Sequence, residues 1–220
     1  MSHRIEAVLF DMDGLLVDSE PLWTIGEIEL AEHLGGTWSD ELKTAIIGTR
    51  LDTAIRTILE WYGLPGGAAE ADQAMTFLLD RMVELYHEQL PVMPGAIELV
   101  DAVRAAGAAT ALVSSSYRVL VDAALDTIGR ERFDFSVAGD EVAAGKPDPA
   151  PYLAACDLLD VRPAATVALE DAMSGVRSAE AAGCNVVAVP WIAPIEPGPG
   201  RFVVTTLKEI DVDWLLSLGG

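Results

Sequence analysis

Short apolar runs alternate with helix-length segments along most of this chain, and this alternation constrains the fold more than any other feature. The strongest runs are Ile5–Phe10, Ala109–Val113, Thr166–Leu169 and Val186–Val189, and none alternates polar with apolar residues. Such runs are typical of strands buried on both faces of a sheet. Strand, helix and strand at these lengths predict parallel βαβ units. The expected fold class is therefore α/β, a doubly wound parallel sheet with helices on both faces.

Weaker apolar runs at Phe133–Ala138 and Phe202–Thr205 predict two further strands of the same sheet. The helices expected between the strands mostly end at a glycine, which favours a left-handed C-cap. These helices are expected at Ala96–Ala106, Tyr117–Ile128, Ala150–Leu159 and Gly175–Ala182.

The interval from residue 16 to residue 87 interrupts this alternation, because it contains amphipathic helical segments and no convincing strand. We interpret it as a helical domain inserted after the first strand, while residues 1–15 and 88–220 form the sheet domain. The inserted helices are expected at Glu20–Leu34, Asp40–Ile46, Leu51–Trp61 and Glu70–Glu88.

Composition excludes several classes of protein. With 51% hydrophobic residues the chain can bury a sizeable core, and its formal net charge of −21 disfavours nucleic acid and anionic membranes as partners. Cys156 and Cys184 are the only cysteines, too few for a disulfide framework, and are expected to be buried core residues. Since no apolar stretch approaches the length of a membrane span, we expect a cytoplasmic protein.

Polar residues follow the expected strands at their carboxyl ends, where open α/β sheets bind ligands. They are Asp11 and Asp13 after the first run, Ser114 and Ser115 after the second, Lys146 after the weaker run at 133–138, and Glu170 and Asp171 after Thr166–Leu169.

The carboxylates of this set would repel one another without a counter-charge. A divalent cation removes the repulsion, and oxygen ligands without nearby His or Cys favour Mg²⁺ over zinc. Lys146 adds a fixed positive charge and Ser114 adds a hydroxyl donor. This combination suits a phosphoryl group, whose charge must be neutralised before a nucleophile approaches.

The same residues carry a resemblance to a known family. The segments Asp11–Ser19, Ser114, Lys146–Pro149 and Glu170–Gly175 resemble the four ordered motifs of the haloacid dehalogenase (HAD) superfamily. Within it, the chain is similar to the branch of sugar-phosphate phosphatases and β-phosphoglucomutases, which have a helical cap inserted after the first motif. The resemblance covers essentially the whole chain and implies a Rossmann-like sheet with an all-helical cap.

The resemblance also implies catalytic roles. Asp11 would be the nucleophile that forms an aspartyl-phosphate, and Asp13 the general acid and base. Ser114 and Lys146 would hold the transferring phosphoryl oxygens, with Ser115 beside them, and Lys146 would also orient Asp11.

The resemblance implies a magnesium site as well. The ion would be held by the side chains of Asp11 and Asp171 and by the backbone carbonyl of Asp13, with Glu170 in direct contact or one shell further out. In the inserted domain, the segment Gly48–Arg50 resembles the cap loop that faces substrate in this branch, which makes Arg50 a candidate specificity residue.

Each position also has a purely structural interpretation. Asp11 and Asp13 could form a capped turn, and Glu170 and Asp171 could cap the following helix. Lys146 and Arg50 could be solvated surface residues, Arg50 pairing with a neighbouring acid.

We expect a Mg²⁺-dependent phosphatase acting on a small phosphorylated metabolite, such as a sugar or polyol phosphate, as a monomer or weak homodimer. The main alternative is a β-phosphoglucomutase-type isomerase, which needs a second cationic phosphate site in the cap. A haloacid dehalogenase needs neither a metal ion nor an acidic residue at position 13, so the presence of Asp13, Glu170 and Asp171 argues against that activity. A non-catalytic metal- or partner-binding module is a further alternative. The cap offers only scattered cations, namely Lys43, Arg50, Arg56 and Arg81.

Overall fold

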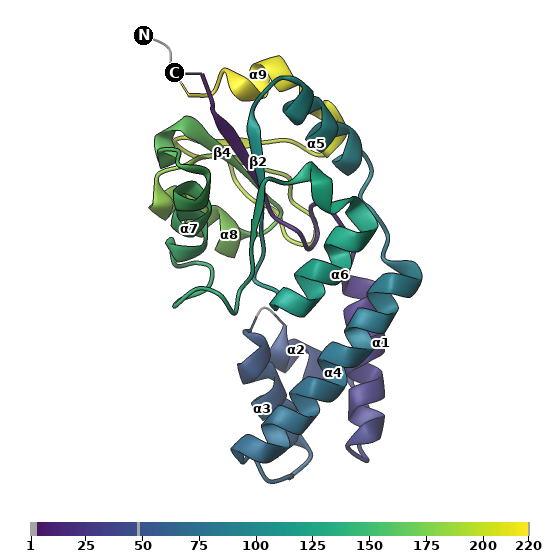
Figure 1. Ribbon diagram of the computed structural model, residues 1–220. Coiled ribbons are helices and arrows are strands. Elements are labelled where there is room, and N and C mark those ends of the chain that lie inside the picture. Colours follow the sequence, from purple (N-terminus) through teal and green to yellow (C-terminus); the bar gives the residue numbers. More distant parts are fainter. Residues whose placement is uncertain (1–3, 48, 220) are drawn as a thin grey trace. The chain divides into compact units, whose positions relative to one another are not determined.

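A computed structural model describes residues 4–47 and 49–219 of the chain (Figure 1). The chain divides into two compact units. Met1–Ser19 and Leu90–Gly220 form the first, called here the sheet unit, and Glu20–Gln89 forms the second, the helical unit.

The helical unit is slightly shorter at its start than the expected 16–87 insertion. Residues 16–19 stay with the sheet unit because backbone bonds tie them to the returning chain. Met93 N–H donates to the Leu16 carbonyl, and Asp18 N–H donates to the Pro91 carbonyl, both at 2.9 Å. The two connections between the units therefore run side by side at this point.

Among its described residues, the sheet unit has six parallel strands in the order β3-β2-β1-β4-β5-β6. Every apolar run interpreted as a strand forms one, so the expected doubly wound α/β fold is confirmed. The strands are β1 (Ala7–Phe10), β2 (Ala109–Val113), β3 (Phe135–Val137), β4 (Thr166–Glu170), β5 (Asn185–Ala188) and β6 (Arg201–Val203).

Helices cover the sheet on both faces (Figure 1). On one face, α7 and α8 pack over β2, β4 and β5 around a core that includes Tyr152 and Val176. Cys156 and Cys184 are free thiols in this core, as expected. The helices of the unit are α5 (Ala96–Ala105), α6 (Arg118–Ile128), α7 (Ala150–Leu159), α8 (Met173–Ala182) and α9 (Val212–Leu216), with 3₁₀ turns at Arg130–Arg132, Pro163–Ala165 and Leu207–Glu209.

The strand order reverses at β1, which has β2 on one side and β4 on the other. Asp11 follows β1 directly, and its N–H donates to the Leu169 carbonyl of β4 at 3.0 Å. Glu170 is the last residue of β4. The carboxyl ends of β1 and β4 thus meet at the switch point, where open α/β sheets form their ligand crevice.

The helical unit contains four helices among its described residues. Gly26 brings α1 and α4 close together, because a Cβ at this position would lie 2.8 Å from the Met82 sulfur. Ser39 caps α2 by accepting a hydrogen bond from Leu42 N–H at 3.2 Å. The helices are α1 (Glu20–His33), α2 (Asp40–Ile46), α3 (Leu51–Trp61) and α4 (Ala68–Gln89).

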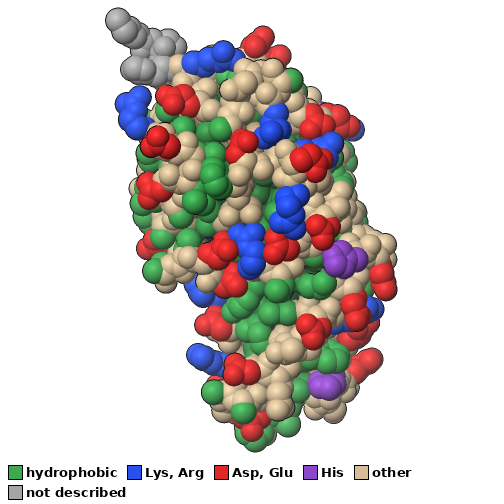
Figure 2. All heavy atoms as spheres, viewed as in Figure 1, with side chains coloured by type: hydrophobic (Ala, Val, Ile, Leu, Met, Phe, Trp, Pro, Cys, Tyr) green, Lys and Arg blue, Asp and Glu red, His purple; other side chains and the backbone are tan. Residues whose placement is uncertain are grey.

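No helix in the described part of the chain is both long and apolar enough to cross a membrane. On the face drawn in Figure 2, acidic side chains are spread over each unit, and Lys and Arg side chains lie among them. This mixture reflects the excess of 35 acidic over 14 basic residues.

Candidate active site

A buried cluster of charged side chains lies at the switch point of the sheet. The Lys146 ammonium donates to Asp11 Oδ1 at 2.5 Å, to Glu170 Oε1 at 2.6 Å and to the Val113 carbonyl at 2.9 Å. The side chains of Lys146, Asp11 and Glu170 are only 5%, 8% and 1% exposed. Interpreting Lys146 as a solvated surface residue is therefore wrong. An ammonium has three hydrogens, and each is matched by one of these acceptors.

The carboxylates of Asp11, Glu170 and Asp171 converge, with one oxygen of each lying within 4.8 Å of the others. Burial raises the pKa of Asp11 well above its ordinary value, and neighbouring carboxylates add to the shift while Lys146 opposes it. Burial, followed by repulsion from Glu170, raises the pKa of Asp171 to about 7. Lys146 alone does not offset the negative charge, so this oxygen-only cluster fits a hard divalent cation.

Two glycines make room for these carboxylates. Gly14 has φ +83°, and a Cβ there would lie 2.3 Å from Asp171 Oδ2. A Cβ on Gly175 would lie 1.9 Å from Glu170 Oε1, so the first turn of α8 can pack directly against this carboxylate. The N-cap of α8 is Ala172, so the alternative interpretation of Glu170 and Asp171 as helix caps is wrong.

The Asp13 carboxylate is surrounded by hydroxyl groups. Ser19 donates to its Oδ1 at 2.6 Å, while Ser116 and Ser114 donate to its Oδ2 at 2.8 and 3.2 Å. Ser114 Oγ in turn accepts from Ser116 N–H at 2.9 Å. The structure thus brings Asp13 and Ser114 together as expected for one site. The expected use of the Asp13 backbone carbonyl as a metal ligand stays a prediction.

A model of the haloacid dehalogenase-like hydrolase family matches residues 5–183 of the chain. The chain belongs to this family. It is therefore a HAD-like hydrolase.

Several relatives are similar over most of their length. Hexitol phosphatase B of Escherichia coli (strain K12) is 32% identical over 210 residues, covering 94% of this chain and 92% of that protein. The phosphorylated carbohydrates phosphatase of Thermotoga maritima is 33% identical over 184 residues, covering 81% and 82%. The crystal structure of CbbY from Rhodobacter sphaeroides in complex with phosphate superposes with a TM-score of 0.83 at 30% identity, covering 93% and 96%.

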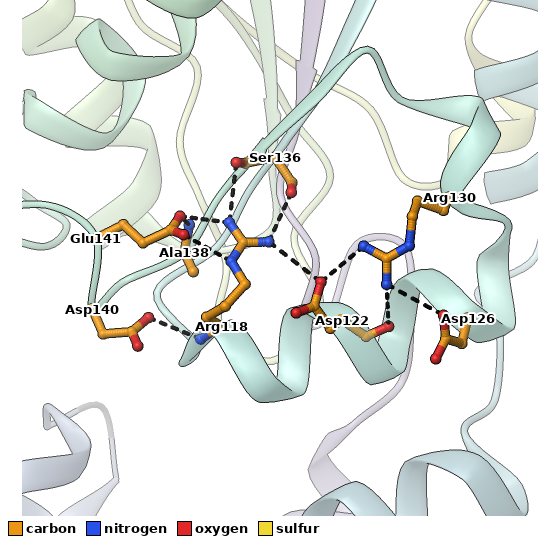
Figure 3. Close-up of polar contacts among 8 residues, drawn as sticks. All are labelled: Arg118, Asp122, Asp126, Arg130, Ser136, Ala138, Asp140 and Glu141. Atoms are coloured by element: carbon orange, nitrogen blue, oxygen red, sulfur yellow. Dashed lines mark hydrogen bonds and ion pairs between the residues drawn. The ribbon is translucent and has the colours of Figure 1, made fainter.

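Arg118, the first residue of α6, binds both β3 and the loop that follows β3 (Figure 3). The Arg118 guanidinium donates to both Glu141 carboxylate oxygens, at 2.9 and 2.5 Å, and to Ser136 Oγ at 2.9 Å. Arg118 N–H also donates to Asp140 Oδ1 at 2.8 Å. These contacts, largely at the protein surface, join the start of α6, which follows Ser114 in the chain, to the segment that precedes Lys146.

Ser115 and Arg50 are the two remaining residues that were expected to contact the substrate. The Ser115 side chain is exposed, and its carbonyl lies where a Cβ on Gly139 would be 2.1 Å away. Arg50 belongs to the helical unit, where it is exposed and pairs with Asp52 at 3.5 Å. Gly48, which formed part of the same expectation, lies outside the described residues. The substrate roles of Ser115 and Arg50 stay predictions.

Three residues of the site received no catalytic or metal-binding role from the sequence: Ser19, Ser116 and Tyr152. Ser116 belongs to the serine run after β2, and Ser19 ends the first motif, so both lay next to predicted positions. Tyr152 lies on the buried stripe of α7, and its hydroxyl donates to Glu170 Oε1. A tyrosine on a buried helix stripe needs a hydrogen-bond partner, which was the available signal.

Proposed function

We propose that this HAD-like hydrolase is a Mg²⁺-dependent phosphatase that hydrolyses a small phosphorylated metabolite, a sugar or polyol phosphate. The observation that carries the proposal is the buried contact at 2.5 Å between the Asp11 carboxylate and Lys146, beside two further carboxylates. The names of the relatives support the same substrate class, since they describe phosphatases of hexitols and of phosphorylated carbohydrates.

In this mechanism Asp11 is the nucleophile. Its carboxylate oxygen forms a bond to phosphorus while the bond from phosphorus to the sugar oxygen breaks. Asp13 gives its proton to the leaving alkoxide, which departs as the free alcohol. Asp13 then takes a proton from water, whose oxygen attacks phosphorus, so that inorganic phosphate leaves and the Asp11 carboxylate is restored.

Lys146 holds Asp11 in position and stabilises its ionised form. All three ammonium hydrogens face protein acceptors, so direct contact with a phosphoryl oxygen requires exchanging one of those bonds. Ser114 and Ser116 donate to Asp13 and lie beside the nucleophile's strand, where their hydroxyls can also turn to phosphoryl oxygens.

Asp11, Glu170 and Asp171 are the residues that would hold Mg²⁺, with the Asp13 carbonyl as a further ligand. When bound, the ion supplies positive charge that offsets the phosphoryl oxygens and the crowded carboxylates. The raised pKa of Asp171, about 7, supports this assignment, because the cluster lacks sufficient counter-charge of its own.

The test is phosphate release from a panel of sugar and polyol phosphates, measured with Mg²⁺ and after chelation. We expect turnover only with the metal, and Asp11→Asn should lower kcat on the order of 10⁴-fold. Asp213→Asn, which changes an exposed acid of α9, is the matched control and should behave as the wild type. Release of no phosphate from any ester would contradict the proposal and favour a non-catalytic binding module.

The mutase alternative is tested with the same panel. Repeating the assay with and without a sugar bisphosphate separates the two activities, because a mutase needs a bisphosphate activator and returns an isomerised sugar phosphate. We expect phosphate release without activator. Strict activator dependence with isomerised product would favour the mutase.

We also propose a cytoplasmic location and a monomer or weak homodimer that does not bind nucleic acid. The acidic net charge of −21 supports the last point. Cell fractionation, sedimentation over a concentration range, and a DNA-binding titration at low salt test these statements in turn.

A further inference from the structure

Tyr152 is a fully buried residue of α7 whose polar end reaches the charged cluster of the sheet unit. Its hydroxyl donates to Glu170 Oε1, the same oxygen that accepts the Lys146 ammonium at 2.6 Å. The ammonium also lies 5.3 Å from the centre of the Tyr152 ring. Tyr152 therefore contacts both Glu170 and Lys146.

Asp11 and Glu170 compete for the same ammonium. Lys146 lies 2.5 Å from Asp11 Oδ1 and 2.6 Å from Glu170 Oε1, so small shifts change how its charge is divided. Without a second donor, a buried Glu170 carboxylate would depend on Lys146 alone for compensation. The Tyr152 hydroxyl supplies that second donor without adding charge.

The position of Glu170 is restricted from its other side as well. Gly175 of α8 packs so closely that a Cβ there would lie within 2.0 Å of both Glu170 carboxylate oxygens. Tyr152, Lys146 and the α8 backbone thus enclose the carboxylate. Both recorded donors bind Oε1, which leaves Oε2 as the oxygen with lone pairs for a metal ion or a metal-bound water.

We propose that Tyr152 is a positioning residue of this site, an inference that rests on the proposed phosphatase function. Its hydroxyl fixes Oε1 of Glu170, turns the other carboxylate oxygen to the magnesium position, and leaves Lys146 free to orient Asp11. Tyr152 touches neither the substrate nor the reacting atoms. It acts through Glu170.

The experiment is Tyr152→Phe, which removes the hydroxyl and keeps the ring that packs in the core. Binding of Mg²⁺ to the full-length protein is measured by calorimetry without substrate, and phosphate release by steady-state kinetics. Loss of a group that orients a metal ligand typically costs 10–100-fold. We expect the Mg²⁺ dissociation constant to rise about tenfold and kcat to fall about tenfold, with KM for the sugar phosphate unchanged.

Two further variants separate positioning from a general loss of stability. Tyr62→Phe removes the hydroxyl of a tyrosine of the helical unit, which donates to the Thr37 carbonyl at 2.9 Å, and should leave Mg²⁺ binding and kcat unchanged. In a Glu170→Gln background, adding Tyr152→Phe should have no further effect on either quantity, because the carboxylate through which Tyr152 acts is gone.

The proposal is overturned if Tyr152→Phe binds Mg²⁺ as the wild type does, if Tyr62→Phe shows the same losses, or if the two effects add in the double variant. A wild type that binds Mg²⁺ but releases no phosphate would instead refute the proposed function. In that event the calorimetric comparison still decides whether Tyr152 positions Glu170.

Discussion

The two units of the molecule bury carboxylates in different ways. In the sheet unit, Asp11 and Glu170 share the Lys146 ammonium, and Glu170 also accepts from Tyr152. In the helical unit, Glu27 of α1 has a buried Oε2 with no hydrogen-bond partner among the described residues. Burial raises the pKa of Glu27 to about 7, the charge of Lys43 opposes the shift, and Glu20 adds to it.

The two units differ in which acceptors the cation nearest to the buried carboxylate binds. Lys146 directs all its hydrogens to the acceptors around Asp11 and Glu170, whereas Lys43 donates to Thr24 at 2.6 Å and pairs with Glu20 at 2.9 Å. Charge in the sheet unit is thus compensated by a dedicated partner, while Glu27 is disfavoured as an anion. Removing the positive charge of Lys146 should therefore destabilise the sheet unit, whereas removing the negative charge of Glu27 should stabilise the helical unit.

The largest expected effect comes from Lys146→Met, which leaves the Asp11 and Glu170 carboxylates buried without their cation. Breaking a buried pair by removing one partner typically costs about 3–5 kcal/mol. We expect the free energy of unfolding at pH 8 to fall by about that amount, measured by urea titration without metal. The loss should shrink at lower pH, because the orphaned carboxylates can then take up protons.

Lys208→Met is the matched control, because Lys208 is exposed in the sheet unit. Surface substitutions of this kind usually change stability by less than about 0.5 kcal/mol. An equal loss in both variants would mean that removing any positive charge destabilises this acidic chain, and the contrast between the units would lose its basis.

Glu27→Gln should have the opposite sign. The Glu27 pKa is about 7 in the folded protein against 4.5 in the unfolded chain, so the wild type loses stability as the pH rises from 4.5 through 7. Partial exposure reduces the effect, and we expect the variant to be more stable by about 2 kcal/mol at pH 8. Near pH 4.5 the two proteins should be equally stable.

Urea titrations of wild type and Glu27→Gln at a series of pH values measure this difference directly, since all other titrating groups cancel. Glu29→Gln is the control, because Glu29 lies on the same helix but pairs with Arg81 at 2.6 Å. A stability difference that does not change between pH 4.5 and pH 8 would show that Glu27 ionises normally in the folded protein.

The cluster of Asp11, Glu170 and Lys146 could be predicted largely from the sequence, whereas the burial of Glu27 could not. Asp11 and Glu170 follow apolar strands, and parallel strands bring their carboxyl ends to one edge of a sheet. The order and spacing of the motifs then placed Lys146 in the same predicted site. Glu27 lies within α1, where the sequence around it does not distinguish it from a solvated acid, and its burial depends on how α1 packs against its neighbours.

The same distinction explains what was missed inside the site. Tyr152 lies on the buried face of α7, a helix that the sequence predicts without showing which face is buried, and its contact with Glu170 depends on how that helix lies over the sheet. The carboxylate trio of Asp11, Glu170 and Asp171 also depends on the close approach of Gly14 to Asp171, which is distant from it in sequence. Local patterns predicted which residues gather, and tertiary packing decided which atoms meet.

The smallest effect is expected where the bonds are many but exposed, at the clamp formed by Arg118 and Glu141 in Figure 3. Arg118→Lys keeps the charge and loses the two-point contact with Glu141, whose side chain is 44% exposed. Exposed pairs contribute about 1 kcal/mol or less and are screened by salt. We expect a loss of that size in 0.05 M salt, measured by urea titration, and almost none at about 1 M, whereas the loss in Lys146→Met should not depend on salt. A loss at Arg118 as large as that at Lys146 would mean that the number of hydrogen bonds, rather than their burial, sets the cost of breaking an ion pair in this protein.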